Sequence, residues 1–341
     1  MINLYGFTLE EMQDFLTTNN FKKFNAAQLF DWLYLKKARS FQAMSNLSKE
    51  LRTFLEAACA IDLLKVQQHQ HSDDGTHKFL FELFDGYAIE AVLMTHDYGL
   101  SLCVSSQVGC NMGCSFCASG LKKKNRNLTS AEMVSQVMTA EDAMDVKITH
   151  LVVMGTGEPF DNYDNVIRFV KIVNDSKGLA IGQRHITIST CGIVPMIIAY
   201  ANEPIRSNLA VSLHAPNDEL RNLLMPINKR YPLKEIIAAC ETYFEKTSRR
   251  ITFEYLLLSG VNDTLTHADQ LSDLIRGLNA YVNLIPYNHV SEFQYEQTDM
   301  VKAMQFYDRL TKRGITATLR KEQGSDIDAA CGQLRLKSDQ K

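Results

Sequence analysis

Short apolar runs alternate with helix-like segments from about residue 100 to residue 319, and this alternation limits the possible folds more than any other feature of the chain. Alternating strands and helices build a parallel sheet, because each helix carries the chain back to start the next strand in the same direction. The predicted strands are 100–105, 148–154, 185–190, 208–213, 250–258, 281–287 and 315–319. The sequence therefore predicts an α/β protein, either a doubly wound sheet or a whole or partial (β/α) barrel.

The residues before this region predict two smaller units. Thr8 with Glu11, and Asn25 with Gln28, each fit a helix N-cap followed three positions later by Glu or Gln, so 1–60 is expected to be a helical domain. Alternating residues in 78–83 and 87–94 predict a β-hairpin, within a linker region of 61–95. The histidine-rich stretch 69–77 is interpreted as a polar turn, since no acid or cysteine stands at ligand spacing. The α/β core then spans 96–326, and a C-terminal segment covers 327–341.

Composition narrows the class of protein. A net charge of −3 and a pI near 6.3 give no global case for nucleic-acid binding, so any RNA contact must come from local patches. Eight cysteines in 341 residues are too few for a disulfide scaffold. The amphipathic, acidic N-terminus is unlike a secretory signal, and no stretch of about 20 apolar residues occurs. We therefore expect a cytoplasmic protein with no membrane association.

Three cysteines, Cys110, Cys114 and Cys117, follow the first predicted strand with spacings of three and then two residues. Structural zinc sites require four ligands and usually take cysteines in pairs, so a zinc knuckle fits poorly. In a four-iron cluster, three thiolates leave one iron with an open coordination position. The amino and carboxylate groups of S-adenosylmethionine can chelate that iron while the cluster donates an electron that splits the sulfonium. The spacing therefore predicts a [4Fe-4S] cluster that works with S-adenosylmethionine.

Polar or reactive residues follow most of the other predicted strands. Active sites of (β/α) barrels gather at the C-terminal ends of the strands, so these residues are expected to share one rim. The glycines of "GTGEP" would let backbone approach the methionine part of the cofactor, and Glu158 would accept a hydrogen bond from its ammonium group. The candidates at this rim are Gly157, Glu158, Ser189, His214, Asn288 and Cys331.

The remaining cysteines and one basic run leave alternatives open. Cys103 and Cys331 would face the same cavity if the barrel closes, although a lone cysteine is more often an inert core residue. Three others lie in apolar stretches and are expected to be buried: Cys59, Cys191 and Cys240. The basic run after the cysteine loop either binds phosphate or is only a solvated surface, and it consists of Lys122, Lys123, Lys124 and Arg126.

Several motifs together resemble the RlmN family of radical S-adenosylmethionine RNA methyltransferases. They are "CVSSQVGCNMGCSFCASG", "GTGEP", "VSLHAP", "LMPINKRYP", "VNLIPYN" and "DIDAACGQL". The resemblance implies a partial (β/α)6 radical SAM barrel with a small N-terminal helical RNA-binding domain. It also implies methylation of C2 of an adenine in the peptidyl transferase centre of 23S rRNA, and of an adenine beside the anticodon in tRNA. A reductant such as flavodoxin and a monomeric state are further expectations.

The same resemblance assigns roles to individual residues. Cys331 would carry the methyl group, Cys103 would release the product through a transient disulfide, and Glu90 would accept a proton. The three-cysteine loop would hold the cluster. The residues expected to bind S-adenosylmethionine are Gly157, Glu158, Ser189, Ser212, Leu213, His214 and Asn288.

Two alternatives stand beside this interpretation. The sister family that confers chloramphenicol–florfenicol resistance methylates C8 of the same adenine, but it typically carries alanine after the Gly-Glu pair, where this chain has Pro159. The segment "FNAAQLFDWLY" also favours C2 methylation. A non-catalytic RNA-binding protein with a structural metal is the alternative from another class, and it would need neither an open coordination site nor a second thiol.

Overall fold

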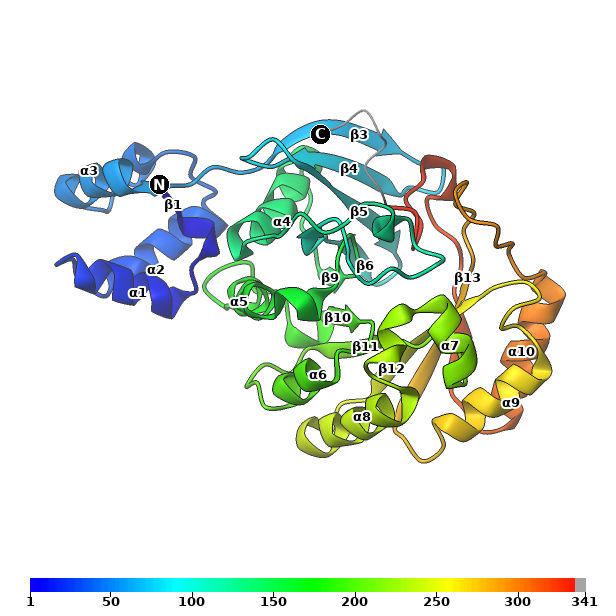
Figure 1. Cartoon of the computed structure of the whole chain (residues 1–341). Helices are drawn as coiled ribbons and strands as arrows, with labels where there is room; N and C mark the ends of the chain where they lie inside the picture. Colours follow the sequence, from blue (N-terminus) through cyan, green and yellow to red (C-terminus); the bar gives the residue numbers. More distant parts are fainter. Residues whose placement is uncertain (335–341) are drawn as a thin grey trace.

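A curved sheet of ten strands forms the centre of the computed structural model, which describes residues 1–334 (Figure 1). The strand order is β14-β13-β12-β11-β10-β9-β6-β5-β4-β3. The strands are β3 (Lys65–His71), β4 (His77–Glu82), β5 (Ala88–His96), β6 (Gly99–Cys103), β9 (His150–Val153), β10 (Ile186–Thr190), β11 (Asn208–Ser212), β12 (Ile251–Leu257), β13 (Ala280–Pro286) and β14 (Ala317–Leu319). All neighbours from β6 to β14 are parallel, whereas β3, β4, β5 and β6 pair antiparallel.

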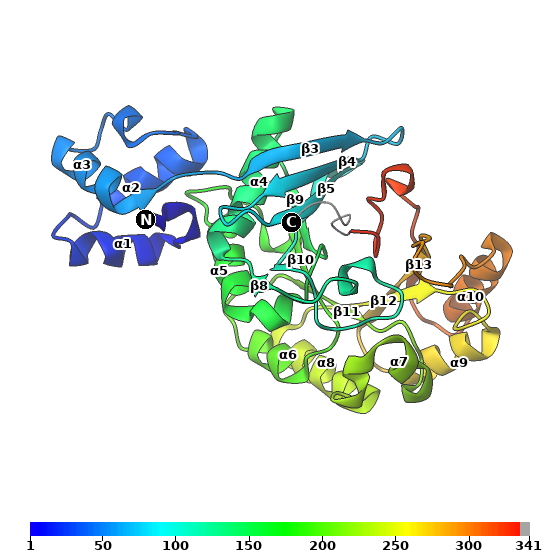
Figure 2. The same cartoon turned by 45° about the horizontal axis from the view of Figure 1, so that its top comes forward.

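Helices cover the outer face of the parallel strands, and the sheet curves into an open barrel (Figure 2). They are α4 (Ser130–Met144), α5 (Tyr163–Asn174), α6 (Val194–Ala201), α7 (Asp218–Leu224), α8 (Leu233–Thr247), α9 (Leu265–Leu274) and α10 (Met300–Lys312). Each predicted parallel strand begins and ends within two residues of the observed one. The structure thus confirms the partial barrel, in which apolar strands are buried between the helices and the interior.

The N-terminal region is helical, as predicted. It contains α1 (Leu9–Thr18), α2 (Asn25–Phe30) and α3 (Lys49–Ala58), with a short strand pair of β1 (Ile2–Asn3) and β2 (Cys59–Ala60). Thr8 and Glu11 form the predicted capping box. The second predicted cap is wrong, because α2 begins at Asn25 itself and the Asn25 side chain donates to Gln28 Oε1 at 2.8 Å.

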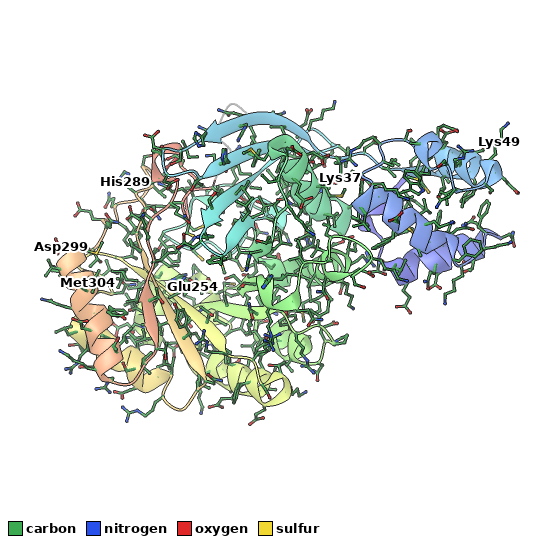
Figure 3. The ribbon with its side chains drawn as sticks, turned by 180° about the vertical axis from the view of Figure 1, so that it is seen from behind. Lys37, Lys49, Glu254, His289, Asp299 and Met304 are labelled. Carbon is green, nitrogen blue, oxygen red and sulfur yellow. The ribbon has the colours of Figure 1, made fainter. Side chains whose placement is uncertain are left out.

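Ion pairs and buried aromatic residues join this helical region to the barrel. Tyr5 is fully buried, and Ser130 Oγ at the start of α4 donates to the Gly6 carbonyl at 2.9 Å. Lys37 pairs with Glu141 at 3.2 Å, so this lysine is at the junction, whereas Lys49 lies at the far end of the helical region (Figure 3). Between the helical region and the sheet, α4 is buried from Ser130 to Glu141, including the acidic residues Glu132 and Glu141.

The prediction that the histidine-rich stretch 69–77 is a polar turn is only partly right. Only Ser72–Thr76 is a turn, because His69 and His71 belong to β3 and His77 begins β4. The prediction missed β3 because its sequence is polar. β3 is a mostly exposed edge strand of the sheet, so it has no apolar face from which a strand could be predicted.

The C-terminal segment crosses the open side of the barrel, between the β3–β4 hairpin and β13 (Figure 2). Residues 335–341 of the predicted segment lie outside the described residues. Within residues 1–334, no helix combines the length and apolar character needed to cross a membrane.

Candidate active site

The three-cysteine loop leaves the end of β6 and turns back before α4. Cys110, Cys114 and Cys117 line a cavity of about 160 Å³ at the C-terminal ends of the parallel strands, which we name the cluster cavity. Gly109 makes the turn possible, because it has a φ of +77° and a Cβ there would lie 2.3 Å from the Lys123 carbonyl oxygen. Phe116 packs edge-on against His214 with ring centroids 4.9 Å apart, which fixes the loop against the strand ends.

The cysteine thiols fit an iron–sulfur cluster better than a single metal ion. Burial raises the pKa of all three, and the neighbouring thiols raise the pKa of Cys110 and Cys114 further. A cationic cluster would offset this cost by stabilising the thiolates. In the part of the chain that the structure describes, no three His, Cys, Asp or Glu side chains converge as a single ion requires. A cluster, whose thiolates bind separate irons, does not require that convergence.

The structure brings most of the predicted rim residues together. Gly157, Glu158, Ser189, Ser212 and His214 all line the cluster cavity. Asn288 lines the adjoining cavity instead, and the Leu213 side chain is fully buried in the main apolar core.

The "GTGEP" loop presents Glu158 to the cavity. Gly157 has a φ of +110°, and a Cβ there would lie 2.6 Å from Gln107 Cβ, so glycine is required. Glu158 is buried, and burial raises the pKa of its carboxyl group. Its oxygens accept backbone hydrogen bonds from Phe160 at 3.0 Å and Cys191 at 2.8 Å. These bonds, with side-chain hydrogen bonds from Thr190 and Cys191, fix the carboxylate at the wall of the cavity, where it would face an ammonium group of the cofactor.

His214 is held as a neutral imidazole. Burial and the nearby Arg221 lower its pKa to about 3. Its Nδ1 accepts the Leu256 backbone N–H at 2.9 Å, which places the ring proton on Nε2. The residue also has a φ of +56°, an uncommon conformation for a non-glycine residue that the surrounding hydrogen bonds maintain.

Sequence reasoning missed two buried charged residues at this site. The Arg221 guanidinium is fully buried and donates to the carbonyl oxygens of Leu213, Cys191 and Ser212. It therefore ties together the ends of β10 and β11. Glu254 on β12 lines the cluster cavity, and burial raises its pKa to about 7 although Arg320 and an Asn283 hydrogen bond lower it (Figure 3).

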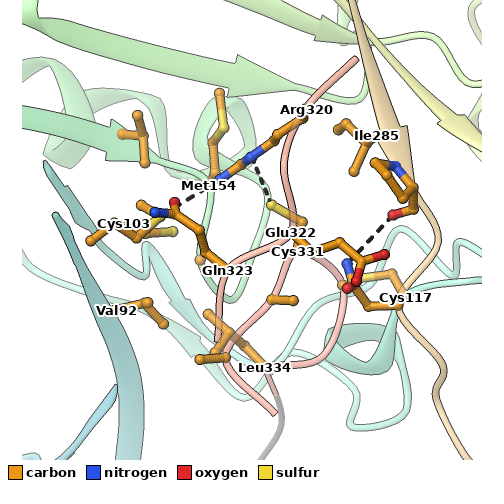
Figure 4. A pocket seen from close by; sticks show the side chains of 18 of the residues that line it. Val92, Cys103, Cys117, Met154, Ile285, Arg320, Glu322, Gln323, Cys331 and Leu334 are labelled. Carbon is orange, nitrogen blue, oxygen red and sulfur yellow. Dashed lines mark hydrogen bonds between the residues drawn. The ribbon is translucent and has the colours of Figure 1, made fainter. Parts of the chain in front are cut away.

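A second cavity of about 70 Å³ adjoins the first and is lined by both candidate transfer cysteines, so we name it the cysteine-pair cavity (Figure 4). Cys103 and Cys331 line it, and Cys117 and Cys331 line both cavities. Burial, with a smaller effect of Cys331, raises the pKa of Cys103 to about 12. Arg320, which sequence reasoning also missed, donates from Nη1 to Cys331 Sγ at 3.0 Å. All eight cysteines are free thiols.

Glu90 lies beside the cysteine pair. It occupies the same face of β5 as Val92 and Met94, which line the cysteine-pair cavity, because side chains alternate along a strand. Glu90 itself lines a third, smaller cavity of about 20 Å³. Ser119 and Leu334 line both this cavity and the cysteine-pair cavity, so the two cavities adjoin. On the strands, Val92 lies directly opposite Cys103, and Glu90 is two residues before Val92.

The basic run after the cysteine loop is largely engaged within the protein. Lys124 pairs with Asp161 at 2.6 Å, and Arg126 pairs with both Asp85 and Glu132. Lys122 and Lys123 are exposed. Phosphate binding by this run therefore stays a prediction, and binding through Lys124 or Arg126 would have to compete with these ion pairs.

Comparison with known proteins agrees with this arrangement. Residues 104–270 match the radical SAM superfamily, and residues 2–61 match the N-terminal domain of ribosomal RNA large subunit methyltransferases. The chain is 52% identical to a Bacillus pumilus protein named "Probable dual-specificity RNA methyltransferase RlmN", covering 100% of this chain and 95% of the relative. A Staphylococcus carnosus protein of the same name is 54% identical, over 99% and 94%. The chain belongs to the RlmN family.

A solved structure extends the likeness to three dimensions. The crystal structure of a radical SAM methyltransferase from Sphaerobacter thermophilus superimposes with a TM-score of 0.92 at 44% identity, covering 98% of this chain and 99% of that one. Membership of the RlmN family gives this chain a [4Fe-4S] cluster and S-adenosylmethionine as cofactors. The residues of the cluster cavity fit both groups.

Proposed function

We propose that this protein is a radical S-adenosylmethionine methyltransferase that methylates C2 of an adenine in 23S rRNA and C2 of an adenine beside the anticodon in tRNA. Its RlmN relatives carry the name of dual-specificity RNA methyltransferases. The observation that carries the proposal is the pair of thiols, Cys103 and Cys331, in a cavity that adjoins the three-cysteine loop. A protein that binds only a structural metal ion would need neither a pair of thiols outside the three-cysteine loop nor a cavity that joins this pair to the loop.

The chemistry of the target explains this site. C2 of adenine lies between two ring nitrogens and is electron-poor, so it does not attack a methyl sulfonium by polar displacement. When bound, the cluster and S-adenosylmethionine supply one-electron cleavage to a carbon radical. Cys110, Cys114 and Cys117 would hold the cluster. Glu158, Ser189, Ser212, His214 and Asn288, together with the backbone at Gly157 and Leu213, would hold the cofactor.

The chain's own residues would complete the transfer. Cys331 carries the one-carbon unit and becomes joined through it to the adenine. Glu90 accepts the proton lost from C2 as the radical adduct gives back the one electron that was spent in the cleavage. The Cys103 thiolate then attacks the Cys331 sulfur, so that an S–S bond forms as the carbon–sulfur bond breaks and its electron pair passes to the carbon. That carbon takes a proton to become the methyl group. The disulfide is later reduced.

The remaining parts of the proposal concern partners and place. We propose a small one-electron reductant such as flavodoxin, for which the exposed Asn111 and Gly113 of the cysteine loop offer an approach. A monomer in the cytoplasm fits a single chain that holds every group named above. The substrate adenine would be unstacked or single-stranded, because the cysteine pair lies inside a cavity.

The test is mass spectrometry of 23S rRNA and tRNA from cells with and without the gene, locating the methyl group on the adenine ring. The proposal expects a C2 methyl group that disappears with the gene. A gene-dependent methyl group at C8 would assign the protein to the resistance-type activity, and unchanged RNA would reject the enzyme.

A further inference from the structure

The segment after β14 needs support from elsewhere to hold Cys331 in place. Among the described residues 320–334, its only regular element is a three-residue 3-10 turn, Ser325–Ile327. Two groups of contacts fix it. Beyond Cys331, the Ala118 backbone donates to the Gly332 carbonyl at 2.8 Å, and Ser119 Oγ donates to the Leu334 carbonyl at 3.0 Å.

The β3–β4 hairpin supplies the contacts before Cys331. Asp74 Oδ2 accepts the Gly324 N–H at 2.7 Å, and Ser72 Oγ donates to Asp326 Oδ1 at 2.6 Å. A Cβ at Gly324 would lie 2.9 Å from Thr76 Cγ2, so the backbone at Gly324 packs closely against the Thr76 side chain. The turn 72–76, which has no place in the proposed chemistry, is thus a docking point for the C-terminal segment.

Lys78 joins this docking point to the interior. Its side chain is only 8% exposed, and its Nζ donates to the Asp328 carbonyl oxygen at 3.2 Å. The same Nζ pairs with Glu90 Oε1 at 3.0 Å. The register explains the pairing, because Lys78 lies opposite Val92 on β5, and Glu90 is its diagonal neighbour on the same face.

A buried lysine is costly to desolvate, so one that is retained requires compensating contacts. Here one ammonium group reaches both a candidate proton acceptor and the backbone three residues before the candidate methyl carrier. A residue that served only to neutralise Glu90 would not need to reach Asp328.

We propose that Lys78 is a positioning residue that ties the proton-accepting Glu90 to the Cys331 segment and so fixes their relative placement over the cysteine-pair cavity. The inference rests on the proposed roles of these two residues. It predicts that loss of Lys78 slows the transfer step without weakening RNA binding, since no RNA contact is removed.

The first experiment measures the segment itself, in the cluster-loaded protein, by amide hydrogen exchange of peptides covering residues 324–334. In Lys78→Met, exchange should rise by at least about tenfold, the loss expected for one hydrogen bond to a charged donor. Lys78→Arg should restore part of the protection. Lys65→Met, which changes an exposed lysine on the adjacent strand, is the matched control and should leave exchange unchanged.

Lys78→Met removes an ion pair from the buried Glu90 carboxylate and can therefore impair folding. The double variant Lys78→Met/Glu90→Gln removes both charges and separates this cost from the tie to the segment. The proposal expects exchange in 324–334 to remain raised in the double variant. Wild-type exchange in a folded double variant would overturn it.

The second readout is single-turnover methyl transfer in Lys78→Met. The proposal expects a rate lower by at least the same factor of about ten, with RNA affinity unchanged. An unchanged rate, or a loss confined to RNA affinity, would overturn the positioning role. Failure of the proposed function would give a different result. In that case Cys331→Ala would retain methyl transfer, and this would hold whether or not amide exchange in 324–334 changes in Lys78→Met.

Discussion

Substitution of Glu254 by glutamine tests the electrostatics of the cluster cavity. Burial raises the pKa of this carboxyl group from an ordinary value of 4.5 to about 7. Below pH 4.5 the group is protonated in both the folded and the unfolded protein, so it costs no stability. Between pH 4.5 and 7 only the unfolded chain is ionised, and the free energy of unfolding of the wild type falls as pH rises. The loss is complete above pH 7.

The size of the effect follows from this pKa difference. At about 1.4 kcal/mol per pH unit, the loss reaches about 3 kcal/mol. A glutamine side chain does not titrate, and its amide oxygen can still accept from Asn283, which donates to Glu254 Oε2 at 2.7 Å in the wild type. The advantage of Glu254→Gln over the wild type should therefore grow by about 3 kcal/mol between pH 4.5 and 8.

Urea unfolding of both ligand-free proteins, at several pH values across this range, measures the difference. Parallel pH profiles would refute the reasoning, because they would mean that Glu254 is ionised in the folded protein throughout, with Arg320 as its counter-charge.

Three further substitutions test other parts of the site. Arg221→Met should lower the free energy of unfolding by about 3–5 kcal/mol in urea, because it leaves three buried carbonyl groups without their charged donor; a change below about 1 kcal/mol would contradict the assigned contacts. Gly157→Ala should weaken S-adenosylmethionine binding in calorimetry, because the new methyl group meets Gln107, and unchanged affinity would show that the loop adapts. Cys103→Ala should accumulate a covalent protein–RNA species on a denaturing gel, since nothing attacks the Cys331 sulfur; unattached RNA would argue against the role of Cys103 in release.

The parallel part of the fold was predictable because its sequence signal is strong. Fully buried parallel strands are continuous apolar runs, and a cap such as Thr8 with Glu11 marks a helix start. β3 was missed because an exposed edge strand needs no apolar residues. The predicted helix cap at Asn25 was wrong for a different reason. Its side chain bonds to the Gln28 side chain and not to the backbone.

The candidate site was predictable where residues follow strand ends, and unpredictable where a buried charge acts through tertiary contacts. The strand-end rule places His214 and Glu158 at the cavity, and it would also have identified Arg320, which directly follows β14. Glu254, Glu90 and Lys78 share another signal, an ionisable residue on the buried stretch of an otherwise apolar strand. Arg221 has no such signal, because only the folded chain shows that its helix points it at strand-end carbonyls.

The measurement that tests the central claim most directly is anaerobic loading of the purified protein with iron and sulfide, followed by metal analysis and reduction in the presence of S-adenosylmethionine. The account predicts about four iron atoms per chain, lost in Cys114→Ala, and release of 5′-deoxyadenosine on reduction. A colourless protein that binds one zinc ion at the three-cysteine loop and leaves S-adenosylmethionine intact would contradict it.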